Sequence, residues 1–253
     1  MNDALYIGAA GLQAQQMQLD AVANNLANMN TPAYKRTRVA FSEIVQRPEA
    51  AAALADAASG IGVAASASIR SFEAGELRKT DAPMDVAIQG EGFLELLTAD
   101  GTRAFTRGGT LKVGADGQLS TASGQVLKPG LLVPDGTDAV RIAAGGRVQA
   151  RQPGRADWIE VGQLDLVRFP NPQGLAALGG NAYRPTEASG EPIGGRPGED
   201  GLGTLVQGSL ESSNVKLVDE LVQLMVAQRA YEANLKVVQA SDEVLGLVNG
   251  MRR

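Results

Sequence analysis

The sequence predicts an α+β protein in which N- and C-terminal helices pair as a coiled coil, with a mostly antiparallel β domain inserted between them. Two observations lead to this prediction. Apolar residues recur with a seven-residue period near both ends of the chain, whereas the middle alternates short apolar runs with Asp-Gly turn dipeptides. A chain of 253 residues is also long enough to bury a core around such elements.

The N-terminal helix is predicted from small and apolar residues that repeat every seven positions. Glycine and alanine occupy positions 8–11, so a partner helix can approach closely there. Pro32 disfavours helical dihedrals at Thr31 and should end the helix just before it. We therefore assign residues 1–31 to the N-terminal helix of an inner coiled-coil domain. Its predicted positions for helix pairing and assembly are Leu5, Leu12, Leu19 and Leu26.

The C-terminal helix is predicted near the end of the chain, and residues 206–253 are assigned to it. Neither glycine nor proline interrupts residues 215–245, and Asp219 and Glu220 suit the positive end of the helix dipole. Steps of four and three residues from Leu217 reach apolar side chains at seven of ten positions, a stripe that needs a partner helix to cover it. The stripe consists of Leu217, Leu221, Leu224, Tyr231, Leu235, Val238 and Leu245, with Gln228, Asp242 and Asn249 at its polar positions.

A second apolar stripe on the C-terminal helix, formed by Val218, Val222 and Met225, lies beside the first. A single partner helix covers only one stripe, so the second favours contacts with further chains. The sequence therefore predicts a homo-oligomer. An intramolecular helix pair without further contacts is the alternative.

Residues 32–75 are assigned to a joining segment that contains an alanine-rich arm. Residues 50–67 hold ten alanines in eighteen positions, which suits a short helix followed by a flexible arm but does not decide the structure. Nearer its start, Lys35, Arg36 and Arg38 form a run of positive charge that we interpret as a solvated turn.

Residues 76–205 are assigned to the β domain. Short apolar runs, such as residues 93–97, alternate with the turn dipeptides Asp100-Gly101, Asp116-Gly117 and Asp135-Gly136. Residues 158–169 are predicted to form one longer strand. Short strands at this spacing favour an antiparallel sandwich or open barrel over a parallel α/β sheet.

The composition removes most catalytic and metal-binding chemistry. Cysteine and histidine are both absent, so the chain has no thiolate nucleophile and no imidazole base or metal ligand. A net charge of −5, with 28 acidic and 23 basic residues spread along the chain, argues against a nucleic-acid partner. No apolar run approaches the roughly 20 residues that span a membrane. We therefore predict no enzyme activity, no catalytic residues, no cofactor, no metal and no membrane insertion.

The alternative from another functional class is a β-domain enzyme or binding module on a helical stalk. It requires a concave pocket with convergent polar groups within residues 80–200. Nothing in the sequence marks one pair of acidic residues there over another.

Short motifs occur near both ends and in the middle of the chain. Residues 24–28 read Asn-Asn-Leu-Ala-Asn, residues 31–36 read Thr-Pro-Ala-Tyr-Lys-Arg, and residues 228–234 read Gln-Arg-Ala-Tyr-Glu-Ala-Asn. Residues 83–88 and 105–109 add Pro-Met-Asp-Val-Ala-Ile and Phe-Thr-Arg-Gly-Gly. Together they resemble the bacterial flagellar rod and hook proteins, in order and over nearly the whole chain. The terminal motif residues are Asn24, Asn25, Leu26, Asn28, Gln228, Arg229 and Tyr231.

This resemblance is greatest to distal rod members and implies a structural subunit of the flagellar basal body, with a proximal rod subunit as the alternative. It implies type III export without a cleaved signal peptide, and helical assembly into a rigid hollow drive shaft that spans the periplasm and transmits torque to the hook. The implied partners are further copies of the chain, proximal rod proteins, hook protein and the surrounding ring, or bushing, proteins. The family usually has Gly-Phe where Ala33-Tyr34 stands, and its arm is more polar than residues 50–67. No partner residues are therefore transferred to that arm.

Overall fold

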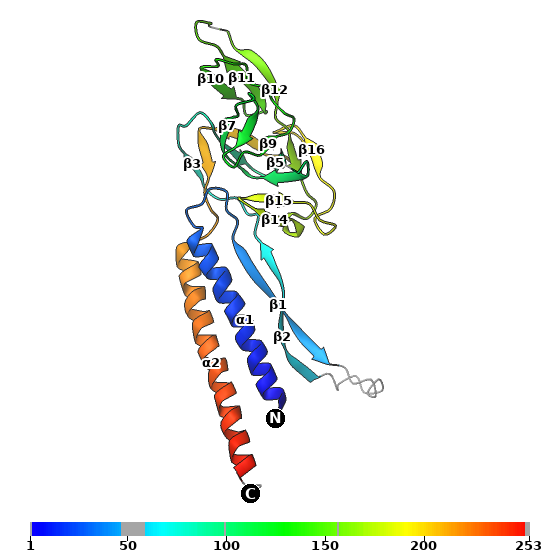
Figure 1. The fold of residues 1–253 in the computed structure, drawn as a ribbon, viewed down its shortest axis with the longest axis vertical. Coiled ribbons are helices and arrows are strands. Elements are labelled where there is room, and N and C mark those ends of the chain that lie inside the picture. The colour runs from blue at the N-terminus through cyan, green and yellow to red at the C-terminus, as the bar shows by residue number, and fades with distance from the viewer. Residues whose placement is uncertain (1, 47–58, 99, 156, 251–253) are drawn as a thin grey trace. The chain divides into compact units, whose positions relative to one another are not determined.

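The computed structural model describes residues 2–46, 59–98, 100–155 and 157–250 (Figure 1). The chain divides into two compact units. The helical unit consists of Met1–Asn28, Arg36–Ser71 and Val215–Arg253, and the β unit consists of Met29–Lys35 and Phe72–Asn214.

Two long helices dominate the helical unit. Helix α1 spans Asn2–Ala27, and helix α2 spans Leu217–Gly250. They lie side by side and run antiparallel, because Asn25 near the end of α1 bonds Glu220 near the start of α2, while Gly8 approaches Val238 (Figure 1). The predicted α+β class, with paired terminal helices and an inserted antiparallel β domain, is confirmed.

The two helices approach closely at the glycines of α1. A Cβ placed on Gly8 would lie 2.7 Å from Val238 Cγ2, and one placed on Gly11 would lie 2.9 Å from Asn234 Nδ2. Both distances are shorter than a real Cβ contact allows, so a larger residue at either position would force the facing side chain, or α2 itself, to shift. The small residues therefore allow the two helices to approach closely.

An antiparallel hairpin completes the helical unit. Strand β1 spans Thr37–Gln46, strand β2 spans Ser59–Arg70, and both pack against α1 (Figure 1). A two-stranded hairpin is marginal by itself, so the packing against α1 supplies the burial that it needs. The short helix considered for residues 50–67 is absent from positions 59–67, which lie in β2, and its remainder falls outside the described residues.

The β unit is built from short antiparallel strands. Its largest sheet has the order β14-β15-β6-β5-β9-β8-β7-β4-β17, with β13 also paired to β5 and β16 paired to β13. Strands β10, β11 and β12 form a separate sheet, and β3 pairs with β18. The strands of the β unit are β3 (Leu77–Lys79), β4 (Asp85–Gln89), β5 (Phe93–Leu97), β6 (Arg103–Thr106), β7 (Gly108–Val113), β8 (Leu119–Thr121), β9 (Val126–Leu127), β10 (Ala139–Ile142), β11 (Arg147–Arg151), β12 (Ile159–Gln163), β13 (Leu166–Arg168), β14 (Ala176–Gly179), β15 (Ala182–Arg184), β16 (Ile193–Gly195), β17 (Thr204–Gln207) and β18 (Ser209–Glu211), with a 3₁₀ turn, η2, at Pro172–Gly174.

The single long strand predicted for residues 158–169 is wrong. The structure divides it into β12, which pairs with β11, and β13, which pairs with β5 and β16. Between them, the Leu164 backbone N–H bonds the Gly146 carbonyl instead of a strand neighbour. The chain therefore passes from the three-stranded sheet to the largest sheet at Leu164.

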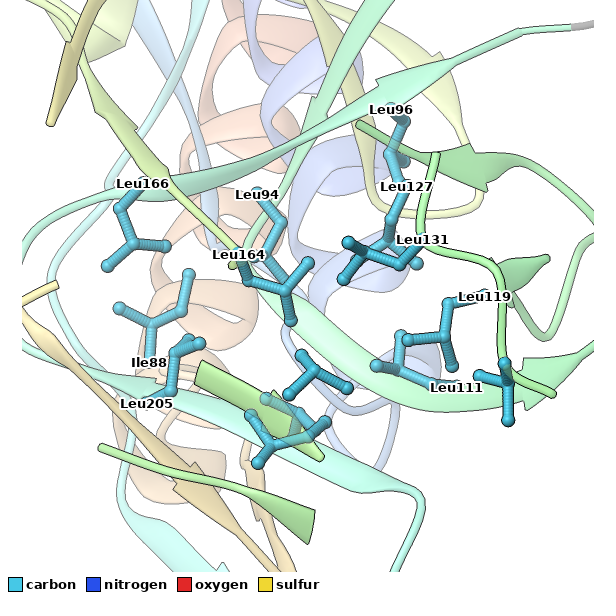
Figure 2. Packing of buried hydrophobic residues seen from close by; sticks show 14 of the residues in the cluster. Ile88, Leu94, Leu96, Leu111, Leu119, Leu127, Leu131, Leu164, Leu166 and Leu205 are labelled. Atoms are coloured by element: carbon cyan, nitrogen blue, oxygen red, sulfur yellow. The ribbon is translucent and has the colours of Figure 1, made fainter. Parts of the chain in front are cut away.

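Leucine, isoleucine and valine side chains fill the main core of the β unit. Figure 2 shows those from β4, β5 and β17 converging with residues of the connecting segments. The Gln207 side chain ties the three-stranded sheet to this core, because it donates a hydrogen bond to Val140 O and accepts one from Ile142 N, both in β10, and it also donates to Pro83 O. The labelled members are Ile88, Leu94, Leu96, Leu111, Leu119, Leu127, Leu131, Leu164, Leu166 and Leu205.

Aromatic side chains form a second cluster in the β unit. Phe105 is fully buried, and its ring meets Phe169 edge to face with centroids 4.9 Å apart. Phe93 contacts Phe72, Phe169 and Tyr183 in similar geometry, with centroids 5.4 to 6.2 Å apart. Each such pair adds about 0.5–1.5 kcal/mol beyond simple burial.

We predict that Phe105→Ala destabilises the β unit by about 3–5 kcal/mol, because it opens a cavity among rings that cannot collapse fully. The single tryptophan, Trp158, lies in the β unit, so its fluorescence during urea unfolding of the full chain measures the loss. Phe41→Ala is the matched control, since Phe41 lies on β1 and is 42% exposed. A similar loss for both variants would contradict the prediction.

Candidate assembly interface

The four leucines predicted as contact positions on α1 are all half-buried. Leu5, Leu12, Leu19 and Leu26 lie on the helix flanks, and none is enclosed completely. The most buried α1 side chains are instead Ala14, Val22 and Asn25, at 1 to 2% exposure. The face that α1 buries within this chain is therefore lined by smaller side chains than the predicted leucine stripe.

On α2, the structure divides the predicted stripe into buried and exposed halves. Leu224, Val238 and Leu245 are half-buried on the side of the helix pair. Leu217, Leu221 and Leu235 remain 44, 43 and 39% exposed, and Tyr231 is 36% exposed. The structure thus brings only part of the predicted stripe against α1.

The prediction missed the α2 residues that face α1, which come one position before exposed members of the predicted stripe. We call Glu220, Ala227, Asn234 and Ser241 the inner row of α2, and Leu221, Gln228, Leu235 and Asp242 the outer row. Glu220 bonds Asn25, Asn234 packs over Gly11, and Ala227 is only 2% exposed. Every member of the outer row is exposed. Neighbouring helix positions differ by about 100°, so facing α1 with one row turns the other row away.

The second predicted stripe is also open. Val218, Val222 and Met225 are 71, 48 and 54% exposed, and the neighbouring Val226 is 62% exposed. With the outer row they give α2 a broad apolar surface that this chain leaves uncovered among its described residues. A contiguous apolar surface of this kind makes α2 a candidate for contact with another protein.

The terminal motifs contribute differently. Asn25 makes paired bonds with the Thr37 backbone, donating to its carbonyl and accepting from its N–H, both at 2.9 Å. Asn28 donates back to Asn24 O at 2.9 Å, which closes the last turn of α1. Gln228 and Arg229 are exposed on α2. A role for these motif residues in contacts with other subunits stays a prediction.

A buried carboxylate of the helical unit, Glu220, accepts hydrogen bonds from residues of two of the N-terminal motifs. The Glu220 side chain is fully buried and accepts hydrogen bonds from Asn25 Nδ2, at 3.1 Å, and from Arg36 Nε. Because Asn25 also holds Thr37, this cluster connects α1, the start of β1 and the start of α2.

A second buried carboxylate lies in the β unit. Glu211 Oε1 accepts bonds from Lys35 Nζ at 2.7 Å and the Gly75 N–H at 2.9 Å. Glu211 Oε2 accepts from Arg107 Nε at 3.1 Å, and Arg107 Nη1 also donates to the carbonyls of Gly90 and Gly92. The Lys35, Glu211 and Arg107 side chains are at most 4% exposed, so these charges depend on one another.

The interpretation of Lys35 and Arg36 as part of a solvated turn is therefore wrong. Lys35 is fully buried, and Arg36 bonds the buried Glu220, while Arg38 alone is exposed. Local composition did not reveal these partners because Glu211 and Glu220 lie at the other end of the chain. The motifs at residues 31–36 and 105–109 were the available signal, since they contain both cations that bind Glu211.

Burial and pairing pull the two pKa values of this cluster in defined directions. Burial lowers the pKa of Lys35 below its usual value, and the attraction of Glu211 opposes this only in part. Burial acts to raise the pKa of Glu211, but the charges of Arg107 and Lys35 and the bonds from Lys35 and Gly75 outweigh it and hold that pKa below 4.5. Glu211 is thus ionised in the folded protein at neutral pH.

The described residues contain no cluster of three or more carboxylates that could hold a metal ion. Neither described helix is long and apolar enough to cross a membrane.

We predict that Glu211→Ala costs the β unit about 3–5 kcal/mol, because it leaves the buried Lys35 and Arg107 charges without their carboxylate. Urea unfolding followed by Trp158 fluorescence measures the change. Glu76→Ala removes an exposed carboxylate and should change stability by no more than about 0.5 kcal/mol. Equal losses in the two variants would contradict the ion-pair account.

Glu211 should also make stability depend on acid. The pKa of Glu211 is lower in the folded protein than its usual value of 4.5. Its contribution to the free energy of unfolding is therefore fully present above pH 4.5 and is lost as the pH falls through the folded pKa. Burial acts to raise the pKa of Glu95, but the hydrogen bonds and charges of Arg103 and Lys128 outweigh it and lower that pKa, so Glu95 acts in the same direction. Glu211→Gln should therefore reduce, but not abolish, the stability difference between neutral pH and a pH below 4.5. An unchanged difference would refute the assignment to Glu211.

Comparison with known families gives three matches in chain order. Residues 5–35 match the family model described as flagella basal body rod protein, and residues 87–150 match the flagellar hook protein FlgE/F/G D1 domain. Residues 206–251 match the flagellar basal body rod FlgEFG protein C-terminal model. The terminal matches cover most of α1 and all of α2.

Relatives match over the full chain. The flagellar basal-body rod protein FlgG of Borreliella burgdorferi is 38% identical, and the match covers 100% of both chains. FlgG of Caulobacter vibrioides is 37% identical over 98% of this chain and 99% of its own, and FlgG of Bacillus subtilis is 34% identical over 98% of each. FlgF of Salmonella typhimurium is 32% identical over 98% of each chain. Paired terminal helices, an inserted β unit and full-length identity at this level place the chain in the flagellar basal-body rod protein family.

Proposed function

We propose that this chain is a structural subunit of the distal flagellar rod, which assembles with further copies of itself into a rigid hollow drive shaft that transmits torque to the hook. The relatives named FlgG, at 34 to 38% identity, support the distal assignment over the proximal one suggested by FlgF at 32%. The subunit carries no catalytic function. It acts by packing.

The open apolar surface of α2 carries this proposal. Leu217, Leu221 and Leu235 have the spacing of a helix contact stripe, yet they stay about two-fifths exposed beside a completed helix pair. Covering the exposed two-fifths of one such side chain contributes about 0.6–1.2 kcal/mol, so a row of them on each subunit favours association. The partner that fits is another helix with the same repeat, which a second copy of this chain supplies.

The geometry of such contacts explains a filament. The buried row of α2 and its open row point in different directions, so a second copy docks by a different surface from the one used inside the chain. Contacts between unlike surfaces that do not close give an open helical assembly. Side-by-side helices with buried contact rows then resist bending and twisting.

The proposed division assigns residues 1–31 and 206–253 to the helical inner domain, residues 32–75 to the joining segment and residues 76–205 to the β domain. The proposed location is the basal body, across the periplasm, after export without a cleaved signal peptide. Proximal rod proteins, hook protein and the surrounding ring proteins are the proposed neighbours.

We predict that the double variant Leu221→Asp with Leu235→Asp stays folded but fails to polymerise, because it places charge on exposed positions that contact other subunits. Sedimentation of the purified chain and motility of a strain that depends on it measure the two effects. Leu221→Met with Leu235→Met keeps volume and apolarity, so this control should assemble. A motile strain with a normal rod carrying the aspartate pair would refute the proposal.

A further inference from the structure

The helix pair uses the less apolar of two available rows. An apolar criterion favours Leu221 and Leu235 of the outer row for contact with α1, yet Glu220 and Asn234 of the inner row face it. Burying a carboxylate and an amide while leaving two leucines exposed is unfavourable unless other interactions compensate for it.

The compensating interactions converge on Glu220. Its side chain is fully buried, Asn25 Nδ2 and Arg36 Nε both donate to it, and Asn25 is itself held by two bonds to the Thr37 backbone. These donors come from two segments that lie on one side of α2. A rotation of α2 that brought the outer row to α1 would remove Glu220 from both donors.

We propose that Glu220 is a positioning residue that sets the rotation of α2 about its axis. Asn25 and Arg36 hold Glu220 inward, so the inner row faces α1 and the leucines of the outer row are kept free. Close packing at Gly11 and Ala227 then follows from this rotation, and so does the hydrogen bond from Gln18 Nε2 to Gln223 Oε1 at 3.4 Å.

A buried polar residue that selects one of several possible helix packings is a known use of such groups, since mispairing leaves it without partners. Here the choice is rotational. The role of this rotation in assembly rests on the proposed function, because the same rotation that gives Glu220 its hydrogen-bond donors presents the outer row to neighbouring subunits.

The chain contains no cysteine, so single cysteines can report the rotation directly. Ala227→Cys places a thiol on the inner row, at a site that is 2% exposed, and Gln228→Cys places one on the exposed outer row. Asn234→Cys and Leu235→Cys form a second pair one heptad further along. In the full-length chain, at a dilution where it sediments as a monomer, a water-soluble maleimide should label each outer thiol faster than its inner neighbour. The expected ratio is about tenfold or more.

Glu220→Leu should abolish or invert both labelling ratios while the helical circular dichroism signal is retained. Asp219→Leu is the matched control, because it removes an exposed carboxylate from the same helical turn and should keep the ratios. If Glu220→Leu loses helix, Asn25→Ala tests the same bond from α1 with the α2 sequence unchanged. It should also lower the ratios.

Three outcomes would overturn the proposal. These are equal labelling of inner and outer thiols in the parent background, unchanged ratios in a folded Glu220→Leu variant, or loss of helix in both Glu220→Leu and Asn25→Ala. The last result would mean that the Glu220 cluster is required for α1 and α2 to pair at all, and does not select one rotation of α2 over another. Because labelling is measured on monomers, failure to polymerise would count against the proposed function and leave this result unaffected.

Discussion

Two buried carboxylates organise the chain, one in each unit. Glu211 holds Lys35 and Arg107 in the β unit, and Glu220 holds Asn25 and Arg36 in the helical unit. Lys35 and Arg36 are consecutive residues at a boundary between the two units, yet each bonds within a different one. A buried charge without its partner is costly, so each carboxylate fixes where the N-terminal and C-terminal parts of the chain meet within its own unit.

The helical unit leaves exposed some apolar side chains of α2 that a different packing of the two helices would bury. Its inner contacts rely on Gly8, Gly11 and Ala227, which allow close approach but bury little area, while Leu221 and Leu235 stay open. A protein that acts alone would gain stability by covering those leucines. For a subunit of a shaft they are more useful as contacts with neighbours, because association then supplies free energy that the single chain lacks. The β unit differs in this respect, since its leucine core and aromatic cluster are enclosed within one chain.

Sequence periodicity predicted the helices, their pairing and the antiparallel character of the middle, because these follow from local patterns of apolar residues and turn dipeptides. It did not predict which stripe of α2 faces α1. Leu221 and Glu220 are adjacent, and only the positions of Asn25 and Arg36 make the charged residue the buried one. The same limit applies to residues 158–169, whose two halves look continuous in sequence but pair with different strands.

The fold class, the absence of cysteine and histidine chemistry and the family resemblance can all be read from the amino-acid sequence, since each depends on residue identity and spacing along the chain. Three features became visible only in the folded chain: Lys35 is buried, the hairpin β1–β2 packs on α1, and the outer row of α2 stays open. In each case the free energy of burying a charge or exposing a leucine depends on segments outside the local pattern, such as Glu211, which lies 176 positions from Lys35.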